Sequence, residues 1–284
     1  AENGEILNFL RSECVKKGQL TPHYHYVSRP PFTEAEAVRR AIYLAGQTDT
    51  PLYIAHMTCR EAIAELQKAK GTGQRVSGET CTHYLTTTKE VLDNPDFNEA
   101  AKFVCSPALR DREDCEALWQ ALSDGLLTAV SSDHCGIDVA ELKQAGRNDF
   151  TQIPNGSPGA GDRLHMVWTE GVCTGKLTRQ KFVDVIATQP AKINGIYPRK
   201  GTLAVGSDAD VVIFDPNYEG TVHLADNPNG VDYNLYEGRR QSGRVETVLL
   251  RGQVVVENAK FVGRYGQGKF IPANMYASGY ENRN

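Results

Sequence analysis

Residues 126–135 read LLTAVSSDHC and place an acidic residue and a histidine directly after a short apolar run. The run lacks the period of an amphipathic helix, so it predicts a buried strand that delivers Asp133 at its end. In a parallel α/β barrel, catalytic residues collect at the carboxyl ends of the strands, because the loops there vary while the barrel holds the strand ends in place. The sequence therefore predicts that Asp133 belongs to a functional site.

A second run, PLYIAHM at residues 51–57, carries His56 to the end of another predicted strand. The matched placement indicates that His56 and Asp133 are two members of one site. Imidazole and carboxylate groups suit a hydrolytic metal such as zinc, and a nearby carboxylate can also carry protons. The alternative is that each residue is an ordinary hydrogen-bonded group of the core.

Strand and helix patterns alternate up to Asp133, which is typical of an α/β fold. We expect a strand at 51–57, a strand and loop at 75–85, and strands at 102–110 and 126–133. We expect helices from an Asn3 cap to Lys17, from a Thr33 cap to 47, at 58–70 and at 111–125, with 19–32 irregular. The third strand would turn at Ser106-Pro107.

The composition and the sequence pattern of the chain change after Asp133. Residues 136–162 are rich in Gly, Asn and Pro and predict a long loop that could shape a pocket wall, followed by helices at about 162–175 and 178–194. From Pro198 onward short strands alternate with tight turns. We therefore expect a barrel portion at 1–198, a β-sandwich module at 199–261 and a tail at 262–284 that could contact another subunit.

Three further histidines could be ligands. His23 and His25 form an H-x-H pair, but their loop is polar and bounded by prolines, so a surface or packing role is favoured over a metal site. His83 could bind metal or substrate. Because it follows its predicted strand by a few residues, a supporting or packing role is favoured there as well.

Composition excludes several classes of partner. The 284 residues carry a formal net charge of −4, and no cluster of Lys and Arg with aromatic residues predicts a nucleic-acid site. No apolar run approaches the roughly 20 residues of a membrane span, and no signal peptide is evident, so we expect a cytoplasmic protein. The seven cysteines form no C-x-x-C pair, which favours reduced, buried thiols over disulfides or a thiolate site.

Eight segments resemble the D-hydantoinase/dihydropyrimidinase family of the amidohydrolase superfamily, in the family's order. They are AENGEILNFL, PLYIAHMTC, GETCTHYL, VCSPALR, SSDHC, GRNDFTQIPNG, PRKGTLAVGSDADVVIFDP and GKFIP. The resemblance implies an α/β fold, a (β/α)8 TIM-like metal-dependent hydrolase barrel of which this chain holds the later strands, with a small C-terminal β-sandwich. It also implies two zinc ions per complete subunit and a homo-oligomer, either a dimer or a tetramer.

The same resemblance assigns roles to four residues. His56 matches the family's last histidine ligand, and Asp133 matches the aspartate that is both a metal ligand and a proton shuttle. Ser106 and Asn155 match positions whose main-chain groups hold the cyclic amide. The implied reaction is zinc-dependent hydrolysis of hydantoins or dihydropyrimidines, small cyclic amides or ureides, to N-carbamoyl amino acids.

The sequence also departs from the family. The H-x-H of the first barrel strand and the carboxylated lysine find no match, so we expect the chain to be the C-terminal part of such an enzyme and to be inactive alone. An allantoinase-like or dihydroorotase-like cyclic amidase remains an alternative. A non-catalytic dihydropyrimidinase-related scaffold protein is a second alternative, although the presence of both His56 and Asp133 argues against it.

Overall fold

Three parallel strands form the sheet that carries the predicted site in the computed structural model, which describes residues 1–274. They are β1 (Leu52–Ile54), β2 (Val76–Cys81) and β3 (Ala129–Ser131), and β2 lies between the other two. Ile54 pairs with Gly78 and Cys81 pairs with Ser131, so the three carboxyl ends share one edge of the sheet. The predicted α/β arrangement is confirmed for these strands.

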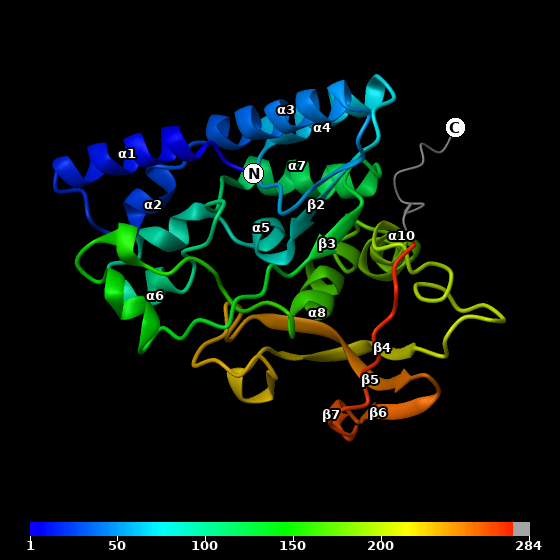
Figure 1. The fold of residues 1–284 in the computed structure, drawn as a ribbon. Helices are drawn as coiled ribbons and strands as arrows, with labels where there is room; N and C mark the ends of the chain where they lie inside the picture. The colour runs from blue at the N-terminus through cyan, green and yellow to red at the C-terminus, as the bar shows by residue number, and fades with distance from the viewer. Residues whose placement is uncertain (275–284) are drawn as a thin grey trace. The chain divides into compact units, whose positions relative to one another are not determined.

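Helices surround this sheet in the first part of the chain (Figure 1). Their bounds are α1 (Gly4–Lys16), α2 (His23–Val27), α3 (Pro31–Gln47), α4 (Arg60–Gly71), α5 (Thr82–Thr86), η1 (Lys89–Asp93), α6 (Phe97–Ala101), α7 (Arg112–Ser123), η2 (Leu142–Gly146) and η3 (Phe150–Gln152). Helix α3 packs on α4, α4 packs on α7, and α3 and α4 also contact β1 and β2 respectively. This layer buries one side of the parallel sheet.

Local sequence signals explain where the first helices begin. Asn3 caps α1, because its side-chain oxygen accepts a hydrogen bond of 3.2 Å from the Ile6 N–H, as predicted. Helix α3 begins earlier than predicted, at Pro31, whose fixed φ suits the first helical position. Thr33 therefore lies inside the first turn, where its hydroxyl donates to the Pro30 carbonyl, and the predicted Thr33 cap is wrong.

Two predicted segments differ from the structure. Residues 19–32 were expected to be irregular, but they contain the short helix α2. Residues 102–110 were expected to be a strand, and no strand is found there. The Val104 carbonyl instead accepts hydrogen bonds from the Gly156 N–H and the Lys143 ammonium, so a loop and a side chain replace the neighbouring strand as partners.

The later part of the chain combines helical turns with an antiparallel sheet. The helical pieces are α8 (Arg163–Val167), η4 (Trp168–Val172), α9 (Arg179–Val183), η5 (Asp184–Thr188) and α10 (Gln189–Ile193), in which η4 and η5 are π-helical turns. The strands are β4 (Val211–Thr221), β5 (Arg240–Leu250), β6 (Gln253–Glu257) and β7 (Lys260–Phe261), with η6 (Leu224–Asp226) between β4 and β5. Their order is β4-β5-β6-β7, each pair antiparallel. The helices and the β-rich texture are confirmed, whereas the second layer of a sandwich stays a prediction.

The chain forms two compact units. The first comprises Ala1–Arg163 with Val222–Gly238, and the second comprises Leu164–Thr221 with the described residues from Arg239 onward. Within the first unit, Asp162 accepts hydrogen bonds from Asn227 at 2.7 Å and Asn234 at 3.2 Å. These bonds hold the segment Val222–Gly238 against the rest of the unit. The boundary at residue 198 rests on sequence texture and stays a prediction. Residues 275–284 of the predicted tail lie outside the described residues.

Two general expectations can be compared with the structure. None of the helices in residues 1–274 is both long enough and apolar enough to cross a membrane. All seven cysteines are free, and five of them are buried, namely Cys14, Cys59, Cys81, Cys105 and Cys115.

Candidate active site

His56 and Asp133 occupy equivalent places at the shared edge of the parallel sheet. His56 follows the last residue of β1 by two positions, and Asp133 follows the last residue of β3 by two positions. Their φ angles are +41° and +44°, in the left-handed region that residues other than glycine rarely adopt. Backbone strain of this kind concentrates at functional sites, where the surrounding structure enforces it.

Hydrogen bonds on the residues after His56 hold its turn. The Met57 N–H donates to the Glu79 carbonyl of β2 at 2.8 Å, and the Thr58 N–H donates to the Glu34 carboxylate at 2.8 Å. The His56 Nδ1 atom is buried, and no hydrogen-bond partner for it lies among residues 1–274. Because buried polar atoms are nearly always paired in folded proteins, this nitrogen is suited to a ligand outside the described chain, such as a metal ion.

The carboxylate of Asp133 lies among three buried protonated groups. Burial is the main cause that raises the pKa of Cys81, Tyr84 and Cys105, and the negative charge of Asp133 adds to each shift. For Cys105 the pKa rises to about 11. The two thiols are therefore protonated at neutral pH, which argues against a thiolate site and supports their role as packing residues.

Histidine 83 lies within electrostatic range of His56. It is buried in α5, and burial together with the neighbouring His56 lowers its pKa to about 3, so the ring is neutral at physiological pH. Its Nε2 atom also has no partner among the described residues. The supporting role predicted for His83 remains a prediction.

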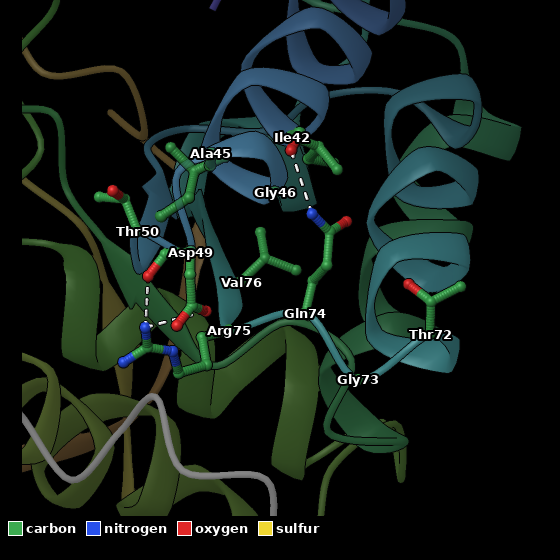
Figure 2. A pocket seen from close by; sticks show the side chains of 11 residues that line it. Ile42, Ala45, Gly46, Asp49, Thr50, Thr72, Gly73, Gln74, Arg75 and Val76 are labelled. Carbon is green, nitrogen blue, oxygen red and sulfur yellow. Dashed lines mark hydrogen bonds and ion pairs between the residues drawn. The ribbon is translucent and has the colours of Figure 1, made fainter.

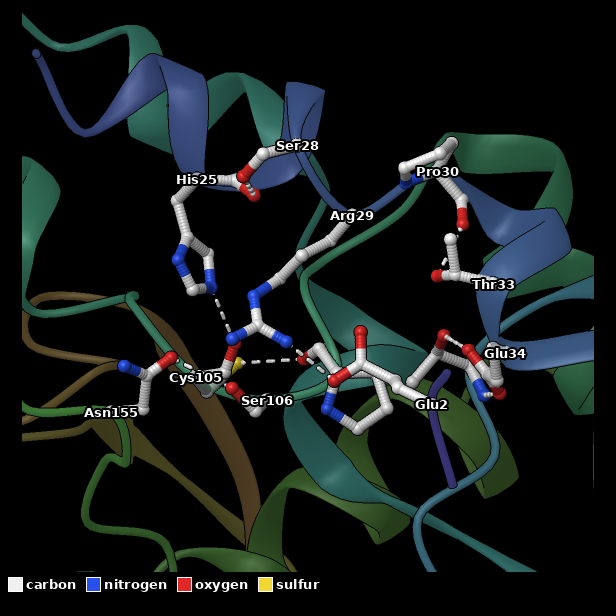
Figure 3. Close-up of polar contacts among 12 residues, drawn as sticks. Glu2, His25, Ser28, Arg29, Pro30, Thr33, Glu34, Cys105, Ser106 and Asn155 are labelled. Carbon is white, nitrogen blue, oxygen red and sulfur yellow. Dashed lines mark hydrogen bonds and ion pairs between the residues drawn. The ribbon is translucent and has the colours of Figure 1, made fainter. Parts of the chain in front are cut away.

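The H-x-H pair is occupied by other protein groups. Figure 3 shows His25 pointing towards Cys105, and its Nε2 lies 2.7 Å from the Cys105 carbonyl oxygen. His23 lies on the same short helix, and its Nδ1 is 2.6 Å from the Asp93 carboxylate. The two rings thus contact different partners, which agrees with the packing role favoured for them over a metal site.

Ser106 and Asn155, separated by 48 residues in the sequence, are in direct contact (Figure 3). The Ser106 hydroxyl donates a 2.7 Å hydrogen bond to the Asn155 side-chain oxygen. The Asn155 amide group in turn donates to the Ile153 carbonyl at 2.9 Å. The peptide bond between Ser106 and Pro107 is cis. The contact brings the two predicted substrate residues to one place.

The Asn155 loop also lies against the chain that follows β3. His134 forms a parallel bridge with Ser157, and the Cys135 N–H donates to the Ser157 carbonyl at 2.9 Å. Gly156 has φ +130°, and a Cβ atom there would lie 2.5 Å from the Cys135 Cβ. Only glycine fits this approach. The loop with Asn155 is therefore a neighbour of the segment that carries Asp133.

Sequence reasoning missed three residues that support this site. Lys143 is fully buried and binds both loops, and Glu34 and Arg110 form a buried ion pair of 3.1 Å beside the His56 turn. A hydrophobicity pattern gave no sign of them, because each lies in a polar loop or at a helix end. Their roles depend on segments that are distant in the sequence.

The described chain offers few side chains that are grouped so that they could coordinate a metal ion. Residues 1–274 contain no group of three or more His, Cys, Asp or Glu side chains arranged to hold a metal ion. His56 and Asp133 are thus two potential ligands, and no third side chain of these types is grouped with them in the described part of the chain.

A small pocket lies at the amino ends of β1 and β2, opposite the edge with His56 and Asp133, and none of the predicted site residues lines it (Figure 2). It is lined by the starts of β1 and β2, at Leu52 and Val76, and by the Arg75–Asp49 ion pair of 3.1 Å. In α/β barrels this end serves stability, whereas the chemistry lies at the carboxyl ends.

Comparisons with known proteins show what this chain is similar to. Residues 33–255 match the amidohydrolase family. A D-hydantoinase of Ralstonia pickettii is 47% identical over 276 residues, which cover 97% of this chain and 60% of that protein. A dihydropyrimidinase of Arabidopsis thaliana is 39% identical over 271 residues, covering 95% of this chain and 51% of that protein.

A solved structure extends the similarity to three dimensions. The crystal structure of a dihydropyrimidinase from Brevibacillus agri NCHU1002 matches with a TM-score of 0.96 at 43% identity, covering 98% of this chain and 60% of that one. The chain thus spans between 51% and 60% of the length of these relatives.

Proposed function

The chain belongs to the amidohydrolase family, and from this premise we propose that it forms part of a zinc-dependent cyclic amidase that hydrolyses hydantoins or dihydropyrimidines to N-carbamoyl amino acids. The predicted resemblance to D-hydantoinases and dihydropyrimidinases is confirmed over 97% of the chain. The observation that carries the proposal is the pair of left-handed turns that place His56 and Asp133 at the same edge of the parallel sheet.

The donor set fits zinc. His56 offers a buried nitrogen that has no partner among the described residues, and Asp133 offers a carboxylate, two ligand types that zinc prefers. We propose that these two residues hold the metal together with ligands from outside the described residues. When bound, zinc supplies a nucleophile at neutral pH and polarises a carbonyl group. Two ions per complete subunit are proposed by resemblance to the family.

The spacing of the strands suits such a site. Because β2 separates β1 from β3, their backbones lie roughly 10 Å apart. Side chains from these two strand ends could therefore reach one metal centre, where zinc would be held by a nitrogen of His56 and a carboxylate oxygen of Asp133. We expect the side chains of His56 and Asp133 to lie within about 8 Å of one another in the loaded enzyme.

Asp133 acts as the proton carrier in this proposal. Its carboxylate accepts a proton from the attacking water and then passes that proton to the ring nitrogen that leaves, so it is a general base and then a general acid. Because proton transfer needs hydrogen-bond contact, the strained turn that fixes Asp133 contributes directly to the rate.

Ser106 and Asn155 bind the substrate through their main-chain groups. Their hydrogen bond joins two loops beside the Asp133 segment, in which Asn155 is exposed and Ser106 is partly exposed. A planar cyclic amide offers one N–H and one C=O side by side, which two such backbone groups can pair with. This arrangement would present the ring carbonyl to the metal.

The wider architecture follows from the same premise. We propose that the parallel sheet of β1, β2 and β3 is part of a (β/α)8 barrel and that the antiparallel sheet β4 to β7 is part of a β-sandwich. We propose a homo-oligomer, either a dimer or a tetramer, as its assembly.

The test is a substrate panel with metal control. The natural full-length protein is treated with chelator, reloaded with zinc and assayed with hydantoin, dihydrouracil, allantoin and dihydroorotate. We expect hydantoin or dihydrouracil to be hydrolysed to the N-carbamoyl product, with activity lost on chelation and restored by zinc. Hydrolysis of allantoin or dihydroorotate alone would reassign the substrate, and absence of any zinc-dependent hydrolysis would reject the proposal.

A further inference from the structure

Lys143 is a fully buried cation that no carboxylate pairs with among the described residues. Its side-chain nitrogen donates hydrogen bonds to three main-chain carbonyls, those of Val104 at 3.2 Å, Pro154 at 3.2 Å and Gly156 at 2.8 Å. Burying a charged amine is costly unless its donors are satisfied. An ammonium group has three N–H donors, so the three carbonyls match its protonated form one for one.

The three carbonyls belong to two loops that are also joined directly. We call residues 102–106 and 153–157 the paired loops. The Gly156 N–H donates to the Val104 carbonyl at 3.0 Å, and the Ser157 hydroxyl donates to the Lys102 carbonyl at 2.7 Å. The paired loops carry the two residues proposed to bind substrate, Ser106 and Asn155. Lys143 therefore connects the two loops that are proposed to bind substrate, and we call its three hydrogen bonds the tie.

The turn that carries Lys143 is packed tightly against one of these loops. Gly146 ends η2, and a Cβ atom there would lie 2.1 Å from the Ile153 Cγ1 and 2.5 Å from the Ile153 nitrogen. The Lys143 N–H also bonds to the Asp138 carbonyl at 3.1 Å. The ammonium therefore has little freedom to turn away, and its contacts are with backbone carbonyls of the paired loops.

We propose that Lys143 is a positioning residue that holds the paired loops in the register needed to bind the cyclic amide, an inference that rests on the proposed function. Its effect on substrate passes through the backbone of Val104, Pro154 and Gly156. Loss of the tie would weaken binding of the ring in the ground state and the transition state alike, which raises KM and leaves kcat nearly unchanged.

The protonation of Lys143 gives the tie a pH dependence. Burial lowers the pKa of Lys143 to about 8, although Cys105 and Cys135 act in the opposite direction. A neutral amine has two N–H donors, so above this pH one carbonyl loses its partner. The groups that face Lys143 are Cys105, Cys135 and His25. Burial raises the pKa of Cys105 to about 11 and lowers the pKa of His25 to about 3. Neither Cys105 nor His25 therefore changes charge near pH 8.

The experiment compares Lys143→Met and Lys143→Arg with the natural protein, in its full-length, zinc-loaded form. Methionine has a similar length and no donor, whereas arginine keeps a permanent charge and several donors. Lys68→Met serves as the control, because Lys68 is 71% exposed on α4 and pairs with Glu65. KM and kcat for hydantoin are measured from pH 6.5 to pH 9.5, and amide hydrogen exchange is followed at Gly156.

We expect Lys143→Met to raise KM about tenfold at pH 7 with kcat within about threefold, because lost hydrogen bonds of a charged donor are worth about that factor or more. The Gly156 amide should exchange faster in this variant. In the natural protein KM should rise above about pH 8, and Lys143→Arg should remove that rise, which a purely structural role would not do. Lys68→Met should match the natural protein throughout.

Two results would overturn the proposal. One is a folded Lys143→Met protein with unchanged KM and unchanged exchange at Gly156. The other is an identical alkaline rise of KM in Lys143→Arg and the natural protein, a comparison that stands even where Lys143→Met does not fold. If the natural protein hydrolyses no cyclic amide, the proposed function fails, whereas the exchange of Gly156 in the variants still decides whether Lys143 ties the loops.

Discussion

At the scale of single residues, the site is defined by backbone geometry as much as by side-chain type. His56 and Asp133 both adopt a left-handed φ, which costs about 1 to 3 kcal/mol for each residue. Neighbouring hydrogen bonds stabilise the His56 turn, since both Met57 and Thr58 donate to residues of other elements. A glycine or a relaxed turn would cost less, so the strain at both residues supports the site proposed for them.

The proposed roles of Asp133 and Ser106 predict unequal effects of substitution. Asp133→Ala removes the proton carrier and a metal ligand, so we expect kcat of the full-length enzyme to fall by roughly 10²-fold to 10⁴-fold. Ser106→Ala leaves the main-chain groups in place and removes only the 2.7 Å bond to Asn155, so we expect a change of less than about tenfold. Steady-state hydrolysis of hydantoin measures both. Equal losses would contradict main-chain binding at Ser106.

His25 predicts a pH dependence of stability. Burial lowers its pKa from 6.5 to about 3, and the nearby Arg29 acts in the same direction. Between these pH values the unfolded chain binds a proton that the folded protein does not, so the contribution is full above about pH 6.5 and is lost as the pH falls towards 3. The slope for one proton is about 1.4 kcal/mol per pH unit.

The measurement is urea unfolding at pH 6.5 and pH 4.5 for the natural protein and for His25→Gln. Glutamine keeps a donor for the Cys105 carbonyl and does not titrate. We expect the natural protein to lose about 2 to 3 kcal/mol more than the variant over this interval. Equal losses would show that His25 already carries its proton in the folded state.

At the scale of elements, the sequence predicts what depends on local pattern. The strands β1, β2 and β3 and the helices α1, α4 and α7 were predicted because apolar period and capping residues are visible in a single segment. The expected strand at 102–110 is absent, since its backbone is paired with Lys143 and Gly156 from a distant loop. The contact of Ser106 with Asn155 was implied by family resemblance, and no sequence period specified its geometry.

A buried ion pair connects three elements near the His56 turn. The Arg110 and Glu34 side chains are 4% and 1% exposed, and Arg110 also donates to the Thr58 hydroxyl at 2.9 Å and to the Arg29 carbonyl. The Glu34 carboxylate accepts from the Thr58 N–H, two residues after His56. The pair therefore fixes the chain that leaves β1 against the start of α3.

Arg110→Met should destabilise the protein strongly. The substitution leaves the Glu34 carboxylate buried without its cation, so we expect the free energy of unfolding to fall by about 3 to 5 kcal/mol. Arg40→Met is the matched control, because its pair with Glu36 is 3.6 Å long and both side chains are about half exposed, which predicts a loss below about 0.5 kcal/mol. Urea denaturation gives both values. Similar losses in the two variants would mean that the Arg110 pair is solvated.

At the scale of the whole molecule, the chain is shorter than the relatives that it matches. Residues 33–255 match the amidohydrolase family, and the chain covers 60% of the length of the D-hydantoinase of Ralstonia pickettii. The parallel sheet of three strands presents the two proposed ligands, and its two outer strands have no further partner among residues 1–274. Unpaired edges of this kind associate readily with other strands.

We predict that a polypeptide limited to these 284 residues does not hydrolyse cyclic amides. A hydrolytic zinc site needs about three protein ligands and a water, and the described residues contain no group of three candidate ligands. The polypeptide should therefore retain little zinc after dialysis, and its unpaired strand edges should favour association. Metal analysis, light scattering and a hydantoin assay check these expectations, with the natural full-length protein as the positive control. Full turnover by a chain whose measured mass is 31.2 kDa would show that two recognised ligands suffice or that a ligand among these residues was overlooked.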